Sequence, residues 1–149
     1  MRDNLIEWLG GHKPNAFATV TLKQGLPHDG GGWAHIRPED MRKTAWLLRD
    51  RVAKGLLGHK RRIPFLVFKE GDGWIKRYHL HITACLPEDI NIARFSSVLR
   101  EKAQRLDWVY GEIDVRPIEP NTEDRVIKYC LKEGFDALLA EASYVPSED

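Results

Sequence analysis

Residues 62–86 read RIPFLVFKEGDGWIKRYHLHITACL. Two segments of this stretch, 62–70 and 75–86, are rich in aromatic and β-branched residues, and a glycine-containing turn at 71–73 separates them. This pattern is typical of two antiparallel strands joined as a β-hairpin. The second strand carries histidines in alternation with apolar residues, so its two faces differ in chemistry.

Strands and helices continue on both sides of this hairpin. The sequence predicts a strand, a long loop and a helix before it, and a helix, a strand and a last helix after it: residues 16–22, 23–37, 38–57, 89–107, 109–118 and 121–133. Pro38 suits the first position of its helix, and Gly58 suits the exit. Asn121 is expected to cap the last helix.

The resulting order, β-α-β-β-α-β followed by a helix, predicts an α+β fold of the split βαβ type. We expect an antiparallel sheet of four or five strands with two helices packed on one face. The first strand and the histidine-bearing strand should lie at the centre, and the other face should be open or partly covered by whatever follows. A chain of 149 residues fits one such domain, with its core at about 14–133 and an acidic tail at 134–149.

Composition argues against a membrane or secreted protein. No apolar segment approaches the ~18 residues needed to span a bilayer. Residues 1–8 carry Asp3 and Glu7 and lack the apolar stretch of a signal peptide. Cys85 and Cys130 have no metal-type spacing and predict buried thiols in a reducing compartment, so we expect a cytoplasmic protein.

The net charge of +1 hides an uneven distribution. Residues 133–149 contain five acidic and no basic residues, so the other 132 residues carry a net charge of +6. A basic body with an acidic tail is compatible with a nucleic-acid partner, although a run of charges is more often only a solvated surface.

His79 and His81 are the first candidate site residues. Because side chains alternate along a strand, both imidazoles should point to one face while Leu80 and Ile82 pack beneath the helices. Two imidazoles placed in this way can bind one metal ion. Taken alone, the His-x-His pattern is more often a pair of surface or partly buried histidines without a ligand.

Glu70 ends the preceding strand, nine residues before His79. If the turn closes the hairpin, its carboxylate lies across from the start of the histidine strand and completes a two-His, one-carboxylate site. Such mixed nitrogen and oxygen ligands suit Mn²⁺ or Mg²⁺, and also Zn²⁺. The alternative is a solvated carboxylate at a turn. Glu112 and Asp114 in the fourth strand are weaker candidates for the same role.

The last helix carries a tyrosine on its polar side. Helical spacing sorts its residues into a side that should face the core and an opposite side: Val126, Ile127, Cys130 and Leu131 on the first, and Arg125, Lys128, Tyr129 and Lys132 on the second. A tyrosine among three cations is a candidate nucleophile. The alternative is a half-exposed tyrosine that covers the end of the core.

Together these features form a set of groups suited to phosphoryl transfer. A divalent ion would polarise a phosphodiester and stabilise charge on its oxygens. Tyr129 would attack the phosphorus and expel a 3′-hydroxyl, which leaves a 5′-phosphotyrosine. Lys132 would hold the phosphate or stabilise the phenolate. A free 3′-hydroxyl can reverse the step, because the phosphotyrosine retains the bond energy.

The sequence resembles the HUH endonuclease superfamily, and within it the single-tyrosine replication initiators (Rep proteins) of rolling-circle plasmids and viruses. The resemblance rests on FATVTL at 17–22, His79-Leu80-His81 and Tyr129-Cys130-Leu131-Lys132, which follow the family's order. It implies sequence-specific nicking and joining of a single-stranded or hairpin DNA origin, with Mn²⁺ or Mg²⁺ as cofactor. In several relatives a Glu upstream of the histidines is the third ligand, as Glu70 would be. No helicase domain follows the motifs, so a separate helicase is an expected partner.

Other interpretations stay open, as does the oligomeric state. A single-tyrosine transposase of insertion elements is of similar size, but it often has Gln in place of Lys after its tyrosine. A conjugative relaxase commonly places its tyrosine near the N-terminus and uses a third His. A two-histidine phosphoesterase needs the His-x-Thr signature twice, and here only His81 begins one. A non-catalytic RRM-like module would stack RNA or DNA bases on aromatic residues of the central strands.

Candidate DNA contacts lie outside the hairpin strands. Phosphate contacts are expected from five cations and base stacking from two tryptophans: Lys60, Arg61, Arg62, Arg125 and Lys128, and Trp33 and Trp74. For residues 60–62 a solvated basic turn is an equal alternative. Trp46 and Trp108 are expected in the core.

Overall fold

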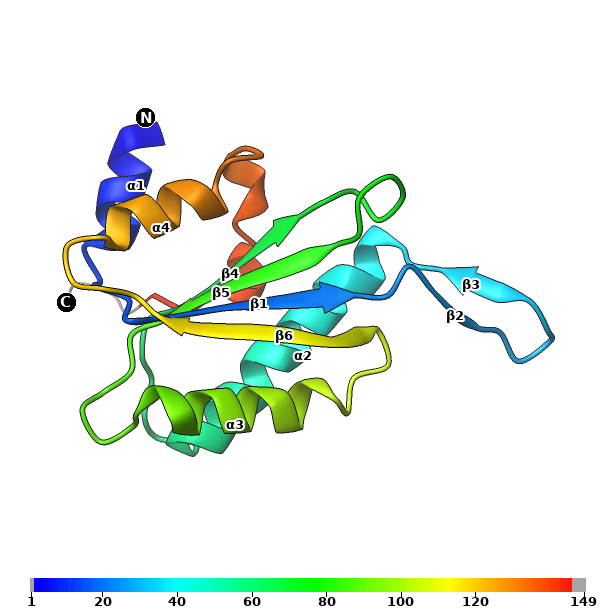
Figure 1. The fold of residues 1–149 in the computed structure, drawn as a ribbon, viewed down its shortest axis with the longest axis horizontal. Helices are drawn as coiled ribbons and strands as arrows, with labels where there is room; N and C mark the ends of the chain where they lie inside the picture. Colours follow the sequence, from blue (N-terminus) through cyan, green and yellow to red (C-terminus); the bar gives the residue numbers. More distant parts are fainter. Residues whose placement is uncertain (1, 146–149) are drawn as a thin grey trace.

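Four strands form one antiparallel sheet, in the order β4-β5-β1-β6, in the computed structural model, which describes residues 2–145 (Figure 1). The strands are β1 (Ala16–Leu22), β4 (Phe65–Glu70), β5 (His79–Ala84) and β6 (Val109–Pro117). β1 and β5 occupy the centre, which confirms the α+β class and the predicted strand order. β4 pairs with β5 as the hairpin expected from residues 62–86.

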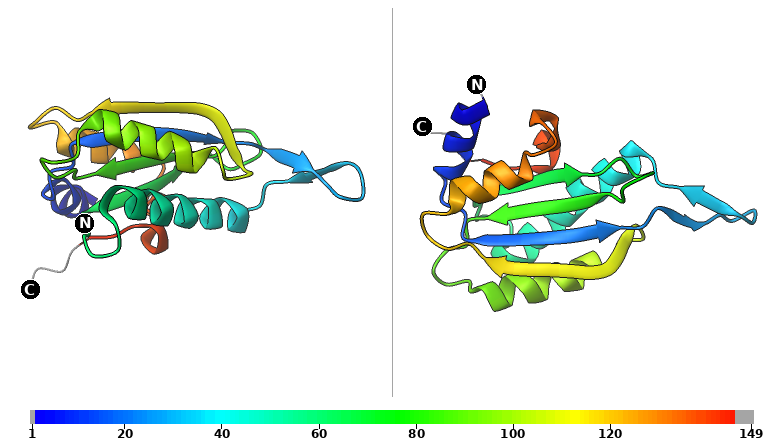
Figure 2. Two further views of the ribbon diagram at one scale, coloured as in Figure 1. Left: turned by 90° about the horizontal axis from the view of Figure 1, so that it is seen from below. Right: turned by 45° about the horizontal axis from the view of Figure 1, so that its top comes forward.

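Helices α2 (Pro38–Leu57) and α3 (Ile92–Ala103) cover one face of this sheet (Figure 2, left). The start of α2 agrees with the prediction, and the Asp40 carboxylate accepts the backbone N–H of Arg37 at 2.9 Å. Gly58 ends α2 with φ 72°, a conformation that favours glycine. In the described part of the chain, no helix has both the length and the apolar character needed to cross a lipid bilayer.

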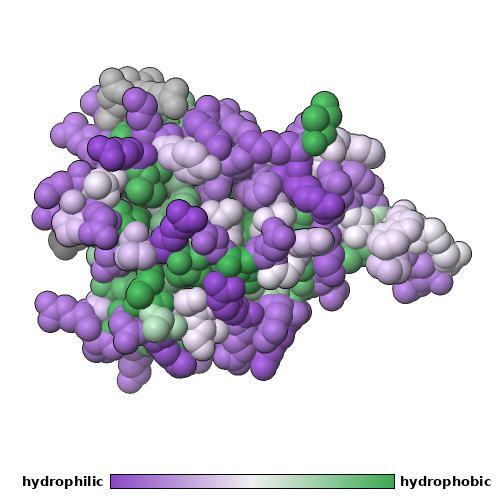
Figure 3. Space-filling model, viewed as in Figure 1, coloured by the Kyte–Doolittle hydropathy of each residue, from purple (hydrophilic) through white to green (hydrophobic). Residues whose placement is uncertain are grey.

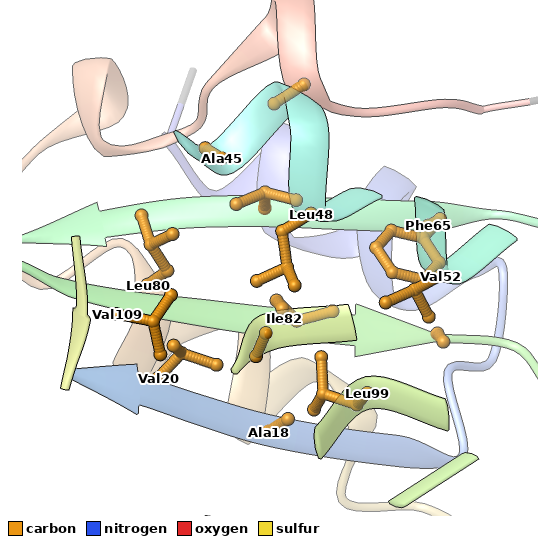
Figure 4. Close-up of a cluster of buried hydrophobic side chains, with 14 of the residues drawn as sticks. Ala18, Val20, Ala45, Leu48, Val52, Phe65, Leu80, Ile82, Leu99 and Val109 are labelled. Carbon is orange, nitrogen blue, oxygen red and sulfur yellow. The ribbon is translucent and has the colours of Figure 1, made fainter. Parts of the chain in front are cut away.

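The main core lies between the sheet and these two helices (Figure 4). Its side chains come from alternate strand positions and from one side of each helix, and they include Ala18, Val20, Leu48, Val52, Leu80, Ile82 and Leu99. Burying this apolar surface is the main source of stability. Trp46, expected in the core, is 44% exposed, because it does not lie on the buried side of α2. Trp108, expected there too, is partly buried and packs against the main core.

A second, smaller core lies on the other face of the sheet, beneath α1 (Arg2–Gly10) and α4 (Glu123–Cys130) (Figure 1). Leu9 of α1, Phe68 of β4 and Ile127 of α4 are fully buried there. The core therefore extends before the predicted range of about 14–133. The apolar residues of α1 are weakly segregated to one side, so its sequence lacks the usual amphipathic signal.

The segment after α4 also packs on the body, through the short 3-10 turns η1 (Phe135–Ala137) and η2 (Ala140–Ala142). Tyr144 exchanges two backbone hydrogen bonds with Phe65 of β4, at 2.7 and 2.8 Å. Residues 134–145 are thus part of the fold, where the sequence predicted an acidic tail from 134 onward. The remaining acidic residues of that tail, at 148 and 149, lie outside the described residues.

The predicted loop at 23–37 contains a small hairpin, β2 (Gly25–Pro27) and β3 (Trp33–His35), which projects from the body (Figures 1 and 2). Each strand has three residues, and glycine, proline and histidine in such short segments do not indicate a strand. Its place is set by tertiary contacts, because the His35 ring nitrogen Nε2 donates to the carbonyl of Gly73 at 2.7 Å.

β5 is shorter than the predicted strand 75–86, because the turn after β4 is longer than 71–73. In this turn the Asp72 carboxylate accepts the backbone N–H groups of Trp74 and Lys76, at 2.8 and 3.1 Å. These bonds compete with strand pairing and delay the start of β5 to His79.

The predicted helix ends also move inward. α3 spans 92–103 where 89–107 was expected, and α4 ends at Cys130 and not near 133. Asn121 does not cap α4: it has φ 72° in the preceding turn, and Thr122 takes the cap position. An asparagine tolerates this left-handed conformation better than most residues, which explains its place in the turn.

Candidate active site

β5 presents His79 and His81 to the face of the sheet beneath α4, as the strand alternation predicts. His81 is 3% exposed, and its ring stacks on that of Phe17 from β1 with 5.6 Å between the ring centroids. His79 is partly buried at the start of β5. A side chain as deeply buried as His81 requires hydrogen-bond partners for both ring nitrogens.

Glu70 is one of these partners. The hairpin register pairs Glu70 with His79, which confirms its predicted position opposite the start of the histidine strand. Oε1 of Glu70 lies 2.7 Å from Nε2 of His81, and because an ionised carboxylate only accepts, Nε2 carries the proton. Oγ1 of Thr19 lies 3.1 Å from Nδ1, so a neutral His81 donates to Glu70 and accepts from Thr19.

Two lysines complete the surroundings of this carboxylate. Nζ of Lys132 lies 2.9 Å from Oε1 of Glu70, and the ammonium group of Lys76 contacts Oε2. Burial alone would raise the pKa of Glu70, but hydrogen bonds from the two lysines and His81 outweigh it and lower this pKa to about 2. Burial lowers the pKa of His81, so its ring is neutral at pH 7. These four residues are called the Glu70 cluster below.

α4 places Tyr129 against the Glu70 cluster. The rings of Tyr129 and His81 meet edge to face, with 5.5 Å between centroids and 70° between planes. Nζ of Lys132 lies 4.1 Å from the centre of the tyrosine ring. Tyr129 is 48% exposed, while Ile127 and Cys130 anchor the other side of α4 in the second core. The predicted nucleophile therefore lies between the Glu70 cluster and solvent.

Three residues of this environment were not predicted as site residues: Phe17, Thr19 and Lys76. Thr19 lies directly opposite His81 in the register of β1 against β5, and the strand alternation of Phe17-Ala18-Thr19 places both outer residues on the same face. That register follows from the packed sheet and is not visible in the sequence. Lys76 lies in an irregular turn, where no periodicity indicates which way a side chain points.

The types of donor at this site, two imidazoles and a carboxylate, are ones that bind divalent cations. Nδ1 of His79 donates to the carbonyl oxygen of Arg77 at 3.0 Å, which leaves Nε2 as the ring nitrogen that can face a ligand. Glu70, 7% exposed, already attracts two ammonium groups, as expected of a buried carboxylate that needs positive charge. Within residues 2–145, no three His, Cys, Asp or Glu side chains are grouped closely enough to hold a metal as they stand. Glu70, His79 and His81 would have to converge by side-chain movement.

The weaker acidic candidates and the basic turn are not brought to the Glu70 carboxylate. Asp114 lies opposite Thr19 but pairs with Arg116 at 2.8 Å, and it lies with Glu112 on β6, which β1 and β5 separate from β4. The turn at 60–62 precedes the opposite end of β4 from Glu70, roughly 20 Å away along the strand.

The basic turn is largely engaged by other groups. Arg61 forms two hydrogen bonds with Asp89, at 2.8 and 2.9 Å, and the guanidinium of Arg62 lies 5.4 Å from the ring centre of Tyr144. Lys60 is exposed. These residues could contact a long substrate only at a distance from Tyr129.

The other predicted DNA contacts lie closer to the site. Arg125 and Lys128 are exposed on α4 and line a shallow hollow with residues of α1. Trp74 is 69% exposed in the turn between β4 and β5, the same turn that carries Lys76 of the Glu70 cluster. Along the chain, Lys128 precedes Tyr129 directly in α4, and Trp74 lies two residues before Lys76 of the Glu70 cluster.

Comparison of the chain with protein-family models, curated proteins and solved structures found no match. The chemistry of the site itself is therefore the basis for a functional assignment.

Proposed function

We propose that this protein is a metal-dependent endonuclease that nicks and rejoins single-stranded DNA, with Tyr129 as its nucleophile. The observation that carries the proposal is the contact of Tyr129 with His81 and of Lys132 with Glu70, residues that lie 48 and 62 positions apart in the chain. A phenol, a carboxylate, imidazoles and an ammonium group in one place are the groups that phosphoryl transfer to a tyrosine requires.

In the proposed reaction the hydroxyl oxygen of Tyr129 attacks the phosphorus of a phosphodiester. The bond between phosphorus and the 3′ oxygen breaks, the phenol loses its proton, and the released 3′ oxygen gains one. The products are a 5′-phosphotyrosine and a free 3′-hydroxyl, and the number of phosphoester bonds is unchanged, so a 3′-hydroxyl can reverse the step. Lys132 would stabilise the negative charge that develops on the phosphate oxygens.

Glu70, His79 and His81 would hold Mn²⁺ or Mg²⁺, which when bound would polarise the phosphodiester. For His81 to become a ligand, its proton must move from Nε2 to Nδ1, where the Thr19 oxygen would accept it and fix the ring. Glu70 must also release Lys76, and this lysine has a second acceptor in reach, since Oε2 of Glu133 lies 3.5 Å from its Nζ.

A non-catalytic RNA- or DNA-binding module of the RRM type is less well supported. Such a module needs an open face on the central strands for stacked bases. Here the equivalent face is occupied, because Phe17 and Tyr129 pack around His81, which is 3% exposed. The space for bases on β5 is therefore filled by the chain's own side chains.

The proposed biological role is initiation of rolling-circle replication at a single-stranded or hairpin DNA origin in the cytoplasm, with a separate helicase to expose the strand. A single-tyrosine transposase would use the same chemistry. Lys132 beside Tyr129, where such transposases often have Gln, favours the initiator. An initiator should join DNA at one origin sequence, whereas a transposase should act at the ends of a mobile element.

A covalent-adduct assay tests the chemistry. We expect the protein to form a denaturation-resistant adduct with labelled single-stranded oligonucleotides in Mn²⁺ or Mg²⁺, and we expect EDTA or Tyr129→Phe to abolish it. Tyr144→Phe is the matched control, because Tyr144 contacts Arg62 at the far end of β4, and it should leave the adduct unchanged. An adduct that persists in Tyr129→Phe or in EDTA would contradict the proposal. Failure of the unmodified protein to form one with a diverse oligonucleotide pool would do so too.

A further inference from the structure

A cleft of about 600 Å³ opens between the β2–β3 hairpin and the turn that joins β4 to β5. Three aromatic side chains line it and are open to solvent: Trp33 is 75%, Trp74 69% and Tyr110 43% exposed. Figure 3 shows the hairpin as a pale, weakly polar projection at the right of the molecule. Large aromatic side chains gathered in an exposed hollow indicate a binding surface, and this volume suits a small ligand group. It is called the aromatic cleft below.

The two walls of the aromatic cleft are fastened to each other. The ring of Trp74 stacks on that of His35, with 3.5 Å between centroids and 16° between planes. Nε2 of His35 donates to the carbonyl of Gly73 at 2.7 Å, and the side-chain amide of Gln24 donates to the carbonyl of Trp74 at 2.8 Å. Trp74 is therefore held in place while most of its surface stays free, which reduces the entropy lost on binding.

The charge of the aromatic cleft is positive. Lys23 and Arg77 line it, and the guanidinium of Arg77 lies 5.3 Å from the centre of the Tyr110 ring. No Asp or Glu is among the described residues that line it. Aromatic faces with cations and without anions fit a ligand that combines flat rings with negative charge. An unpaired nucleotide has both properties, whereas an apolar peptide carries no negative charge to pair with Lys23 and Arg77.

The aromatic cleft adjoins the start of β5, where His79 lies. The carbonyl of Arg77, one of its lining residues, accepts a hydrogen bond from His79 at 3.0 Å. Val109 is buried in the main core, so strand alternation places its neighbour Tyr110 on the opposite face, the one that carries His79. A strand that occupies the cleft would therefore lead onto the face where Tyr129 lies.

We propose that the aromatic cleft binds unpaired bases of single-stranded DNA beside the phosphate that Tyr129 attacks. Trp33 and Trp74 stack on the bases, and Lys23 and Arg77 contact the phosphates. The identity of the ligand as the substrate strand rests on the proposed function. Stacking tolerates any base, so this site holds an unpaired strand and discriminates against duplex DNA, whose bases stack on each other.

The test measures binding without cleavage, with Tyr129→Phe protein in EDTA and fluorescein-labelled single-stranded DNA, by fluorescence anisotropy. Adding Trp33→Ala or Trp74→Ala should weaken binding roughly 5- to 100-fold, the loss expected for one stacking partner. Trp46→Ala is the matched control and should change nothing, because Trp46 is an exposed tryptophan of α2 on the other face of the sheet. Trp33→Phe should retain most of the affinity, because a phenyl ring can still stack on a base. Circular dichroism of each variant checks that it is folded.

The outcomes separate this inference from the proposed function. Unchanged affinity in Trp33→Ala and Trp74→Ala would overturn the inference even if the unmodified protein forms the Tyr129 adduct. Equal affinity for single-stranded and duplex DNA would overturn it too. Loss of affinity in both variants, without any metal-dependent adduct from the unmodified protein, would support the aromatic cleft and contradict the Tyr129 chemistry.

Discussion

Glu70 is the residue on which the site is organised. A carboxylate that is 7% exposed is stabilised only if its charge is matched, and here two lysines and a histidine match it. Its pKa is lowered from an ordinary value of 4.5 to about 2. The ionised form therefore stabilises the folded state above pH 4.5, and this stabilisation is lost as the pH falls through the range down to about 2. With solvent screening at the half-exposed lysines, it amounts to about 2 kcal/mol at pH 7.

Glu70→Gln should remove this pH-dependent part of the stability. We expect the difference in unfolding free energy between the unmodified protein and Glu70→Gln to shrink by about 1 kcal/mol from pH 7 to pH 3. The reason is that pH 3 lies between the pKa of Glu70 in the folded state, about 2, and its ordinary value of 4.5. Urea denaturation at the two pH values measures it. Glu101→Gln, an exposed residue of α3, is the control and should show no such change. A difference that does not depend on pH would show that Glu70 is not ionised in the fold as described.

Lys76 competes with the proposed cation for the carboxylate of Glu70. Lys76→Met keeps most of the side-chain volume and removes the ammonium group, so we expect it to tighten Mn²⁺ binding several-fold in isothermal titration calorimetry. Lys43→Met, an exposed position of α2, should leave the affinity unchanged. Unchanged or weaker Mn²⁺ binding by Lys76→Met would contradict this competition.

At the scale of elements, α4 is the helix that positions the proposed nucleophile. It spans only eight residues, too short to be stable by itself, so its place depends on the apolar side that packs on α1 and β4. Tyr129 and Lys132 owe their position to this packing and not to contacts of their own exposed side.

Ile127→Ala should therefore destabilise the protein by about 2–5 kcal/mol, the usual result of emptying a fully buried site. It should also reduce adduct formation by Tyr129, because α4 would lose its anchor. Lys128→Ala, the next residue on the exposed side, should change the unfolding free energy by less than about 0.5 kcal/mol. Urea denaturation measures both variants, and equal stabilities would show that α4 is not held through Ile127.

In the molecule as a whole, the main core and the candidate active site lie on opposite faces of the sheet. The face covered by α2 and α3 contains the main core (Figure 2). The other face carries the second core beneath α1 and α4, and beside it polar side chains from β1, β4 and β5. The split βαβ order places β5 in the centre, with β4 and β1 on either side, so Glu70, His81 and Thr19 meet across three strands. The β2–β3 hairpin extends that face beyond the end of the sheet.

Local periodicity predicted the hairpin, the order of the elements and the faces on which His79, His81 and Tyr129 lie. Strand alternation placed His79 and His81 together, the turn set Glu70 opposite them, and helical spacing sorted Tyr129 from Ile127. These properties depend on residues that are neighbours in the chain. For this reason the structure agrees with them even where helix and strand ends differ from the prediction by a few residues.

Tertiary structure decided which of these surfaces meet. It buried His81 beneath Tyr129 and turned Lys76 toward Glu70, and it left the cations at 60–62 at the far end of β4. It also added α1 and the β2–β3 hairpin, whose short or weakly amphipathic segments are stable only through contacts with distant parts of the chain. The physical reason is that side-chain direction follows from local backbone geometry, whereas burial and ion pairing depend on packing between segments far apart in the sequence.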